Sequence, residues 1–70
     1  MKRDSVHSSM ITSIGYDDVG TVLEVEFRNG RIYRYFDVPE FLYRGFLLAA
    51  SKGDYFTRRI DDRFRFEEVT

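Results

Sequence analysis

Basic residues gather toward the C-terminal end of this 70-residue chain, where they could bind a polyanion. Arginine binds phosphate through two parallel hydrogen bonds and stacks on bases, so such a segment is a candidate binding site for nucleic acid. Its basic residues are Lys52, Arg58, Arg59, Arg63 and Arg65. Asp54, Asp61 and Asp62 lie among them. The alternative is therefore a solvated surface whose charges pair with one another, at about 0–1 kcal/mol a pair.

Side chains that could perform catalysis or bind a metal are poorly placed. His7 is the only histidine, and a triad with Ser8 or Ser9 would join neighbours that point to opposite faces of a strand. The adjacent carboxylates of Asp17 and Asp18 lack the spacing of a calcium loop. With no cysteine, a structural zinc site is also missing its usual ligands. We therefore expect no enzyme, no metal site and no cofactor.

The bulk composition limits the remaining functions. Seventy residues form one domain, expected over residues 8–70 after a flexible segment 1–7. A net charge of −1 argues against a protein that binds nucleic acid over its whole surface, although it permits a local basic patch. The N-terminus does not resemble a signal peptide, and no apolar run is long enough to span a bilayer. These features predict a cytoplasmic protein without a membrane segment.

Three strands are predicted over residues 8–16, 21–28 and 31–36. The middle one alternates strictly between apolar and charged residues, which is typical of a half-buried strand. Asn29-Gly30 predicts a hairpin with the third strand. A three-residue loop, Arg28 to Gly30, places Val25 opposite Tyr33 and Glu24 opposite Arg34, whereas a two-residue loop would mix the faces. We therefore predict the three-residue loop.

That register assigns the side chains of the hairpin to two faces. The inner face carries Leu23, Val25, Phe27, Tyr33 and Tyr35, and the outer face carries Glu24, Glu26, Ile32, Arg34 and Phe36. Tyr33 and Tyr35 could stack on unpaired bases, but on the inner face they are expected in the core. Phe36 and Ile32, with Arg34 between them, form the better stacking platform, unless a C-terminal arm covers them.

Pro39 suits the first turn of a helix. One apolar stripe of that helix is formed by Leu42, Tyr43, Phe46, Leu47, Ala49 and Ala50. Gly45 is expected to let the helix approach the sheet. Gly53 predicts the helix end near Ser51-Lys52, so Ser51-Lys52-Gly53 is interpreted as a C-terminal cap rather than a phosphate-binding loop.

A short second helix over residues 55–62 and a terminal strand or extended arm over residues 63–67 follow. The expected fold class is α+β: a three-stranded antiparallel β-meander with a helix packed on one face, then the second helix and the possible terminal strand. Residues expected in the core are Phe27, Tyr33, Tyr35, Leu42 and Phe46.

Four stretches give the chain a resemblance to a known family. They are Ser8-Ser9 with Ile11-Thr12-Ser13-Ile14-Gly15-Tyr16-Asp17; Leu23-x-Val25-x-Phe27 with Gly30; Tyr33-Arg34-Tyr35 before Val38-Pro39; and Ala49-x-Ser51-Lys52-Gly53-x-Tyr55-Phe56 before Ile60. Over residues 6–65 the chain resembles the KTSC domain family, found at the C-terminus of some lysyl-tRNA synthetases and as short bacterial proteins. The motif residues, which the resemblance implies are mainly structural, are Ser9, Gly15, Tyr16, Gly30, Tyr33, Tyr35, Pro39, Ser51, Gly53 and Phe56.

The resemblance implies a noncatalytic domain for which RNA binding has been suggested. The residues that we expect to contact RNA are Arg34, Phe36, Lys52, Arg58, Arg59, Arg63 and Arg65. Thr57 and Asp61 stand where the family tends to have Asn and Arg, and Asp61 would repel a phosphate. The alternative function is a protein-interaction domain, which would use the Ile32/Phe36 face or a strand edge for a homodimer or another partner.

Overall fold

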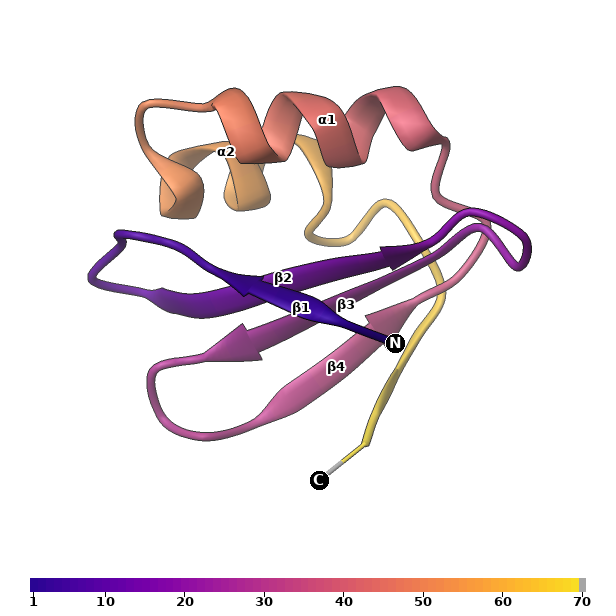
Figure 1. Cartoon of the computed structure of the whole chain (residues 1–70), viewed down its shortest axis with the longest axis horizontal. Coiled ribbons are helices and arrows are strands. Elements are labelled where there is room, and N and C mark those ends of the chain that lie inside the picture. Colours follow the sequence, from indigo (N-terminus) through magenta and orange to yellow (C-terminus); the bar gives the residue numbers. More distant parts are fainter. Residues whose placement is uncertain (70) are drawn as a thin grey trace.

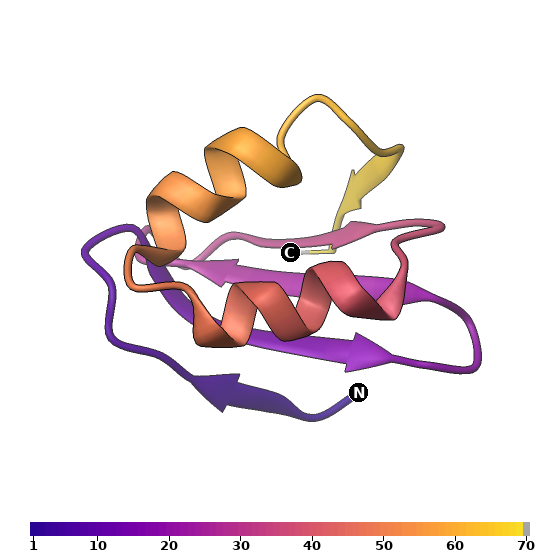
Figure 2. The same cartoon turned by 90° about the horizontal axis from the view of Figure 1, so that it is seen from above.

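The structure is a computed structural model and describes residues 1–69. Five antiparallel strands form one sheet in chain order. They are β1 (Arg3–Ser5), β2 (Ile11–Asp17), β3 (Val22–Phe27), β4 (Ile32–Tyr35) and β5 (Phe66–Glu68). Helices α1 (Glu40–Leu48) and α2 (Lys52–Arg59) come between β4 and β5 and cover one face of the sheet (Figures 1 and 2). The α+β class is confirmed, but four strands rather than three precede the helices.

The hairpin between β3 and β4 has the predicted three-residue loop. Leu23 pairs with Tyr35, Glu24 with Arg34 and Val25 with Tyr33. The loop is closed by a hydrogen bond from the Phe27 amide to the Arg31 carbonyl. Gly30 has φ of 89°, a conformation that residues with a Cβ rarely adopt. The apolar and charged patterns thus predicted the same register that the backbone adopts.

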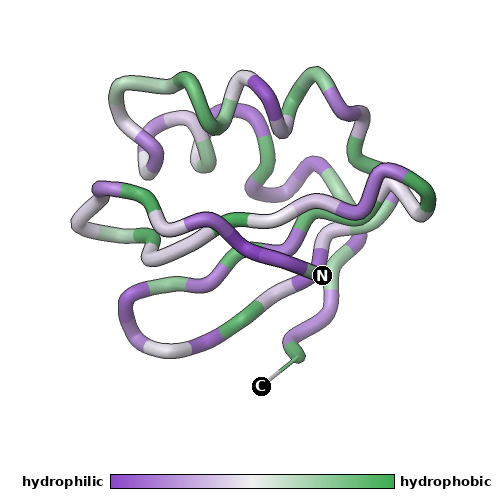
Figure 3. Tube along the Cα trace, in the orientation of Figure 1, coloured by the Kyte–Doolittle hydropathy of each residue, from purple (hydrophilic) through white to green (hydrophobic). Residues whose placement is uncertain are grey.

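Both edges of the sheet are formed by three-residue strands. Strand β1 lies within the segment 1–7 that was expected to be flexible, and it pairs with β2. Strand β5 corresponds to the terminal strand that the alternating residues 63–67 indicated, but it begins three residues later and ends one residue later. Figure 2 shows β1 and β5 on opposite sides of the sheet, and Figure 3 shows that β1 is strongly hydrophilic. Such short, charged strands present little edge for further pairing.

The prediction that the first helix ends near Ser51-Lys52, with Gly53 as its cap, is wrong. Helix α1 already ends at Leu48, and the extended backbone of Ala49 breaks it. Ser51 is instead the N-cap of α2, because its hydroxyl accepts a hydrogen bond from the Asp54 amide at 3.2 Å. Gly53 lies within α2, where a Cβ would come within 3.1 Å of the Met10 sulfur. The reversal at residues 49–51 is what brings both helices over the same face of the sheet.

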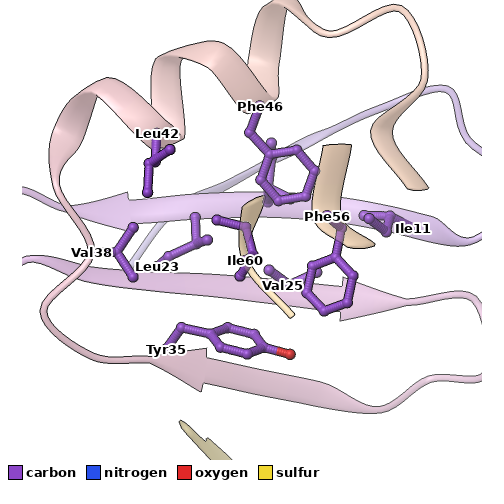
Figure 4. Packing of buried hydrophobic residues seen from close by; sticks show 10 residues of the cluster. Ile11, Leu23, Val25, Tyr35, Val38, Leu42, Phe46, Phe56 and Ile60 are labelled. Carbon is purple, nitrogen blue, oxygen red and sulfur yellow. The ribbon is translucent and has the colours of Figure 1, made fainter. Parts of the chain in front are cut away.

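The core lies between the sheet and the two helices (Figure 4). Its buried members are Ile11, Ile14, Leu23, Val25, Tyr35, Val38, Leu42, Phe46, Phe56 and Ile60. Burial is confirmed for Tyr35, Leu42 and Phe46. Phe27 and Tyr33 are half-buried instead, because they pack at the edge of the core.

Gly45 allows a close helix contact, but with a different partner from the one predicted. A Cβ at this position would lie 2.4 Å from the Tyr55 hydroxyl, which belongs to α2 rather than the sheet. That hydroxyl donates to the Leu42 carbonyl at 2.8 Å. Gly45 therefore makes room for a side chain that joins the two helices.

Candidate nucleic-acid interface

Three of the arginines singled out from the sequence lie together in one open groove. Arg58 and Arg59 extend from the end of α2, and Arg63 lies in the turn that follows. The beginning of α1 forms the opposite wall. We call this the arginine groove; its volume is about 520 Å³ and it is lined by Pro39, Phe41, Leu42, Arg58, Arg59, Arg63 and Phe64.

The three arginines differ in the ion pairs and hydrogen bonds that they form within the domain. Arg58 pairs with Asp54 at 3.3 Å, but both side chains are largely exposed and the pair is easily exchanged. The Nε of Arg63 donates to the Arg58 carbonyl at 3.0 Å, which leaves the terminal nitrogens of that guanidinium to solvent. Arg59 forms no ion pair with the described residues. The groove therefore presents cationic groups that an anionic ligand could contact at little cost.

Aromatic side chains complete the groove and were missed in the sequence. Phe41 is 69% exposed at the start of α1, and Phe64 packs partly against the core. The sequence did contain a signal that Phe41 is exposed, since this residue lies outside the apolar stripe that begins at Leu42. An exposed phenylalanine beside arginines suits a ligand that has both phosphates and planar bases.

A second, smaller groove continues along the helix pair. Its lining adds Ala49, Ala50, Ser51, Asp54 and Tyr55, and it shares Arg58 and Arg59 with the arginine groove. These two arginines therefore stand between the two depressions. The cationic surface follows the boundary between α1 and α2.

Arg34, Phe36 and Arg65 form a separate cluster. The Arg65 guanidinium lies over the Phe36 ring, 5.0 Å from its centroid, and the Phe36 amide donates to the Arg65 carbonyl. Arg34 and Phe36 line a shallow depression that shares no residue with the arginine groove. The C-terminal arm thus covers part of the platform, as the alternative interpretation allowed.

Arg34 is also engaged by a buried carboxylate. Its Nε donates to Glu24 at 2.9 Å, and Arg3 pairs with the other oxygen of the same carboxylate. Burial by itself would raise the pKa of Glu24, but hydrogen bonds and positive charge from Arg34 and Arg3 outweigh it and lower the pKa. The same hydrogen bond raises the pKa of Arg34. Arg34 is thus held in the outer face of the sheet.

Lys52 lies apart from both clusters. Its Nζ donates to the Ala49 carbonyl at 2.5 Å, just beyond the end of α1. A cation there complements the partial negative charge of a helix C-terminus. This contact gives Lys52 a role in the reversal between the two helices.

Most family-motif residues have structural roles. The Tyr16 hydroxyl donates to the Val38 carbonyl at 2.6 Å, and burial with nearby carboxylates raises its pKa. The ring of Tyr35 is buried, and burial together with the Asp61 carboxylate raises the pKa of its hydroxyl. Pro39 is the N-cap of α1, and Phe56 is in the core. Ser9 is exposed.

Neither departure from the family pattern lines a groove. The Thr57 hydroxyl donates to the Gly53 carbonyl one turn earlier in α2. Asp61 is exposed and is not among the residues that line the arginine groove or its neighbour.

The described residues contain no cluster of three or more potential metal ligands. The Ser8 hydroxyl accepts hydrogen bonds from the amides of Met10 and Ile11, so it serves the turn before β2. Within residues 1–69, no helix has the length and apolar character needed to cross a bilayer.

Comparison with known proteins decides the family. The model of the KTSC domain matches residues 7–64. The chain belongs to the KTSC domain family. An uncharacterized protein of Stutzerimonas stutzeri (strain A1501) is 43% identical over 58 residues, which are 83% of this chain and 82% of that protein.

Two further relatives place the KTSC domain in context. The crystal structure of a KTSC domain protein from Yersinia pestis matches with a TM-score of 0.96 at 39% identity, covering 99% of this chain and 97% of that one. A lysine–tRNA ligase of Nostoc punctiforme is 34% identical over 62 residues, which are 89% of this chain. The chain corresponds to only 11% of the length of that ligase.

Proposed function

We propose that this KTSC domain is a noncatalytic, cytoplasmic module that binds RNA through the arginine groove. The observation that carries the proposal is the placement of three arginines and an exposed phenylalanine on the walls of one open groove. Arginine supplies charge and bidentate hydrogen bonds to phosphate, and the aromatic ring supplies a surface for bases. These two components together fit RNA better than they fit a small anion.

The relatives give independent support for an RNA ligand. Lysine–tRNA ligases contain a segment similar to this chain, and these enzymes are named for a reaction of transfer RNA. The low net charge of −1 restricts the electrostatic attraction to a local patch, so we expect moderate affinity that falls steeply with salt. Transfer RNA is accordingly the first ligand to test.

The test is a nitrogen–proton NMR titration of the labelled domain with a transfer-RNA pool at low and physiological salt. We expect shifts in residues 58–64 and at Phe41 that weaken as salt rises. Arg59→Ala with Arg63→Ala should weaken binding and lower the slope of log affinity against log salt by about 1–2. Arg28→Ala with Arg31→Ala is the control for total charge, since it also removes two positive charges, here from exposed contacts with the Ser8 carbonyl and with Glu68.

Three results would contradict this assignment. If no resonances shift at low salt, charge-driven binding of transfer RNA is excluded. Shifts confined to Arg34, Phe36 and Arg65 would move the interface to the other cluster. Equal losses in the groove variant and the hairpin control would show that only total charge matters.

The alternative is a protein-interaction domain, and one observation favours it. Strand β5 is too short to offer much backbone edge, but Phe66 within it and Val69 directly after it are apolar side chains that are 53% and 40% exposed. The Ile32/Phe36 face is less available, because both side chains are half-buried and Arg65 covers Phe36. Sedimentation over a range of protein concentrations separates the cases: a monomer throughout excludes the homodimer.

A further inference from the structure

We infer that the arginine groove accepts an unpaired segment of RNA, one base of which stacks on the ring of Phe41. This inference rests on the proposed function and specifies its ligand. Phosphates on either side of the stacked base would contact Arg59 and Arg63. The ligand class is therefore a flexible single strand or loop, and a regular duplex is excluded.

The exposed ring of Phe41 is the feature that would favour unpaired over paired RNA. It begins the exposed face of α1 and remains 69% exposed although its neighbour Leu42 is buried in the core. A duplex presents base edges and phosphates, because its base faces are covered by the next pair. A base can offer its face to an aromatic side chain only when it is unstacked.

The rest of the groove lining is apolar and suits a base face. Pro39 and Leu42 contribute to it from the α1 side, and Phe64 contributes from the turn after α2. Arg58, Arg59 and Arg63 stand on one wall only, opposite Phe41. This separation matches a nucleotide, whose base and phosphate lie at opposite ends.

The two arginines that line both grooves indicate the path of the bound RNA. Arg58 and Arg59 line both the arginine groove and the neighbouring depression near Ser51 and Tyr55. A backbone that passes these two side chains would run along the boundary between the helices. The single strand would therefore contact α2 through phosphate and α1 through its base.

The test compares an unpaired and a duplex RNA of the same length by fluorescence anisotropy. The single-stranded probe is a labelled oligouridylate of about 12 nucleotides, within the site sizes of known single-strand binders, and the duplex is a labelled G·C-rich RNA of the same length. Phe41→Ala should weaken binding of the oligouridylate by roughly 5- to 100-fold, the loss expected for one stacked base. Phe41→Trp should preserve or improve binding.

Leu48→Ala is the matched control. Leu48 is an exposed apolar side chain of the same helix, 86% accessible and absent from both grooves. Both truncations remove exposed atoms, so each variant should remain folded. A loss confined to Phe41→Ala, together with weaker binding of the duplex, would support the inference.

The outcomes distinguish this inference from the function on which it rests. Equal affinity for duplex and single strand, with no effect of Phe41→Ala but a loss in Arg59→Ala/Arg63→Ala, would overturn base stacking and leave RNA binding intact. Absence of binding to either RNA and to transfer RNA at low salt would overturn both.

Discussion

Arg3 of β1 forms an ion pair with Glu24 of β3, and it reaches that carboxylate across Gly15 of the intervening strand. The pairing register places Arg3 beside Gly15 and Gly15 beside Glu24. A side chain at position 15 would occupy the space that Arg3 crosses, since even a Cβ would lie 3.0 Å from the Arg3 Cγ. The absence of a side chain at Gly15 therefore allows Arg3 to hold strand β1 on the sheet through its ion pair with Glu24.

Gly15→Ala should loosen β1 without disrupting the rest of the fold. A Cβ at position 15 would come within 2.4 Å of the Lys2 carbonyl oxygen, which belongs to the backbone and has little freedom to move. We expect a loss of about 1–3 kcal/mol in the free energy of unfolding and faster hydrogen exchange in residues 3–5. Urea unfolding and amide exchange measure the two effects.

Deletion of residues 1–5 provides the control for that prediction. If Gly15→Ala acts through β1, it should have almost no effect in the shortened chain, because the atoms that it displaces are absent. A full loss in both backgrounds would show that the substitution perturbs β2 itself.

Glu24→Gln should lower stability at neutral pH and have less effect in acid. Arg34 and Arg3 hold the pKa of Glu24 below its ordinary value of 4.5 despite burial. The ionised form therefore stabilises the fold above that value, and this contribution is lost as pH falls through the lower pKa of the folded protein. We expect a deficit of about 1–3 kcal/mol at pH 7 that narrows below about pH 4. An equal deficit at both pH values would contradict the ionic origin.

Phe46→Ala should cost about 3–5 kcal/mol and could unfold a domain of this size. Phe46 is fully buried between α1 and the sheet, and it stacks on Tyr55 with ring centroids 5.3 Å apart. Thermal and urea unfolding give the measurement. Leu48→Ala, on the exposed side of the same helix, should change stability by no more than about 0.5 kcal/mol. Similar melting temperatures for both variants would mean that the face of α1 is assigned incorrectly.

Gly45→Ala should destabilise the domain, although alanine favours helix by about 1 kcal/mol. The added methyl group would displace the Tyr55 hydroxyl and break its hydrogen bond to Leu42. Tyr55→Phe removes that hydroxyl in advance, so the double variant should lose less than the sum of the single variants. Strict additivity in urea unfolding would show that the two positions do not contact.

Local patterns in the sequence determined the hairpin and the face of the sheet that becomes buried. Alternation in residues 21–28 and the Asn29-Gly30 turn fixed the pairing of Val25 with Tyr33, because a shift by one residue would expose the whole apolar set. The stripe on α1 likewise predicted the burial of Leu42 and Phe46. The family motif in turn indicated the KTSC family, which the comparison confirms.

Only the tertiary structure decided where the chain reverses and which arginines meet. Ser51 and Gly53 are compatible with either end of a helix, and the choice depends on the packing of Phe46 and Phe56 from two helices onto one sheet. Strand β1 could not be predicted from apolar alternation, because it has none. Backbone pairing with β2 and the Arg3–Glu24 ion pair hold it in place instead. The arginine groove joins residues from α1 with residues about twenty positions later, and such proximity follows from long-range packing rather than from local sequence.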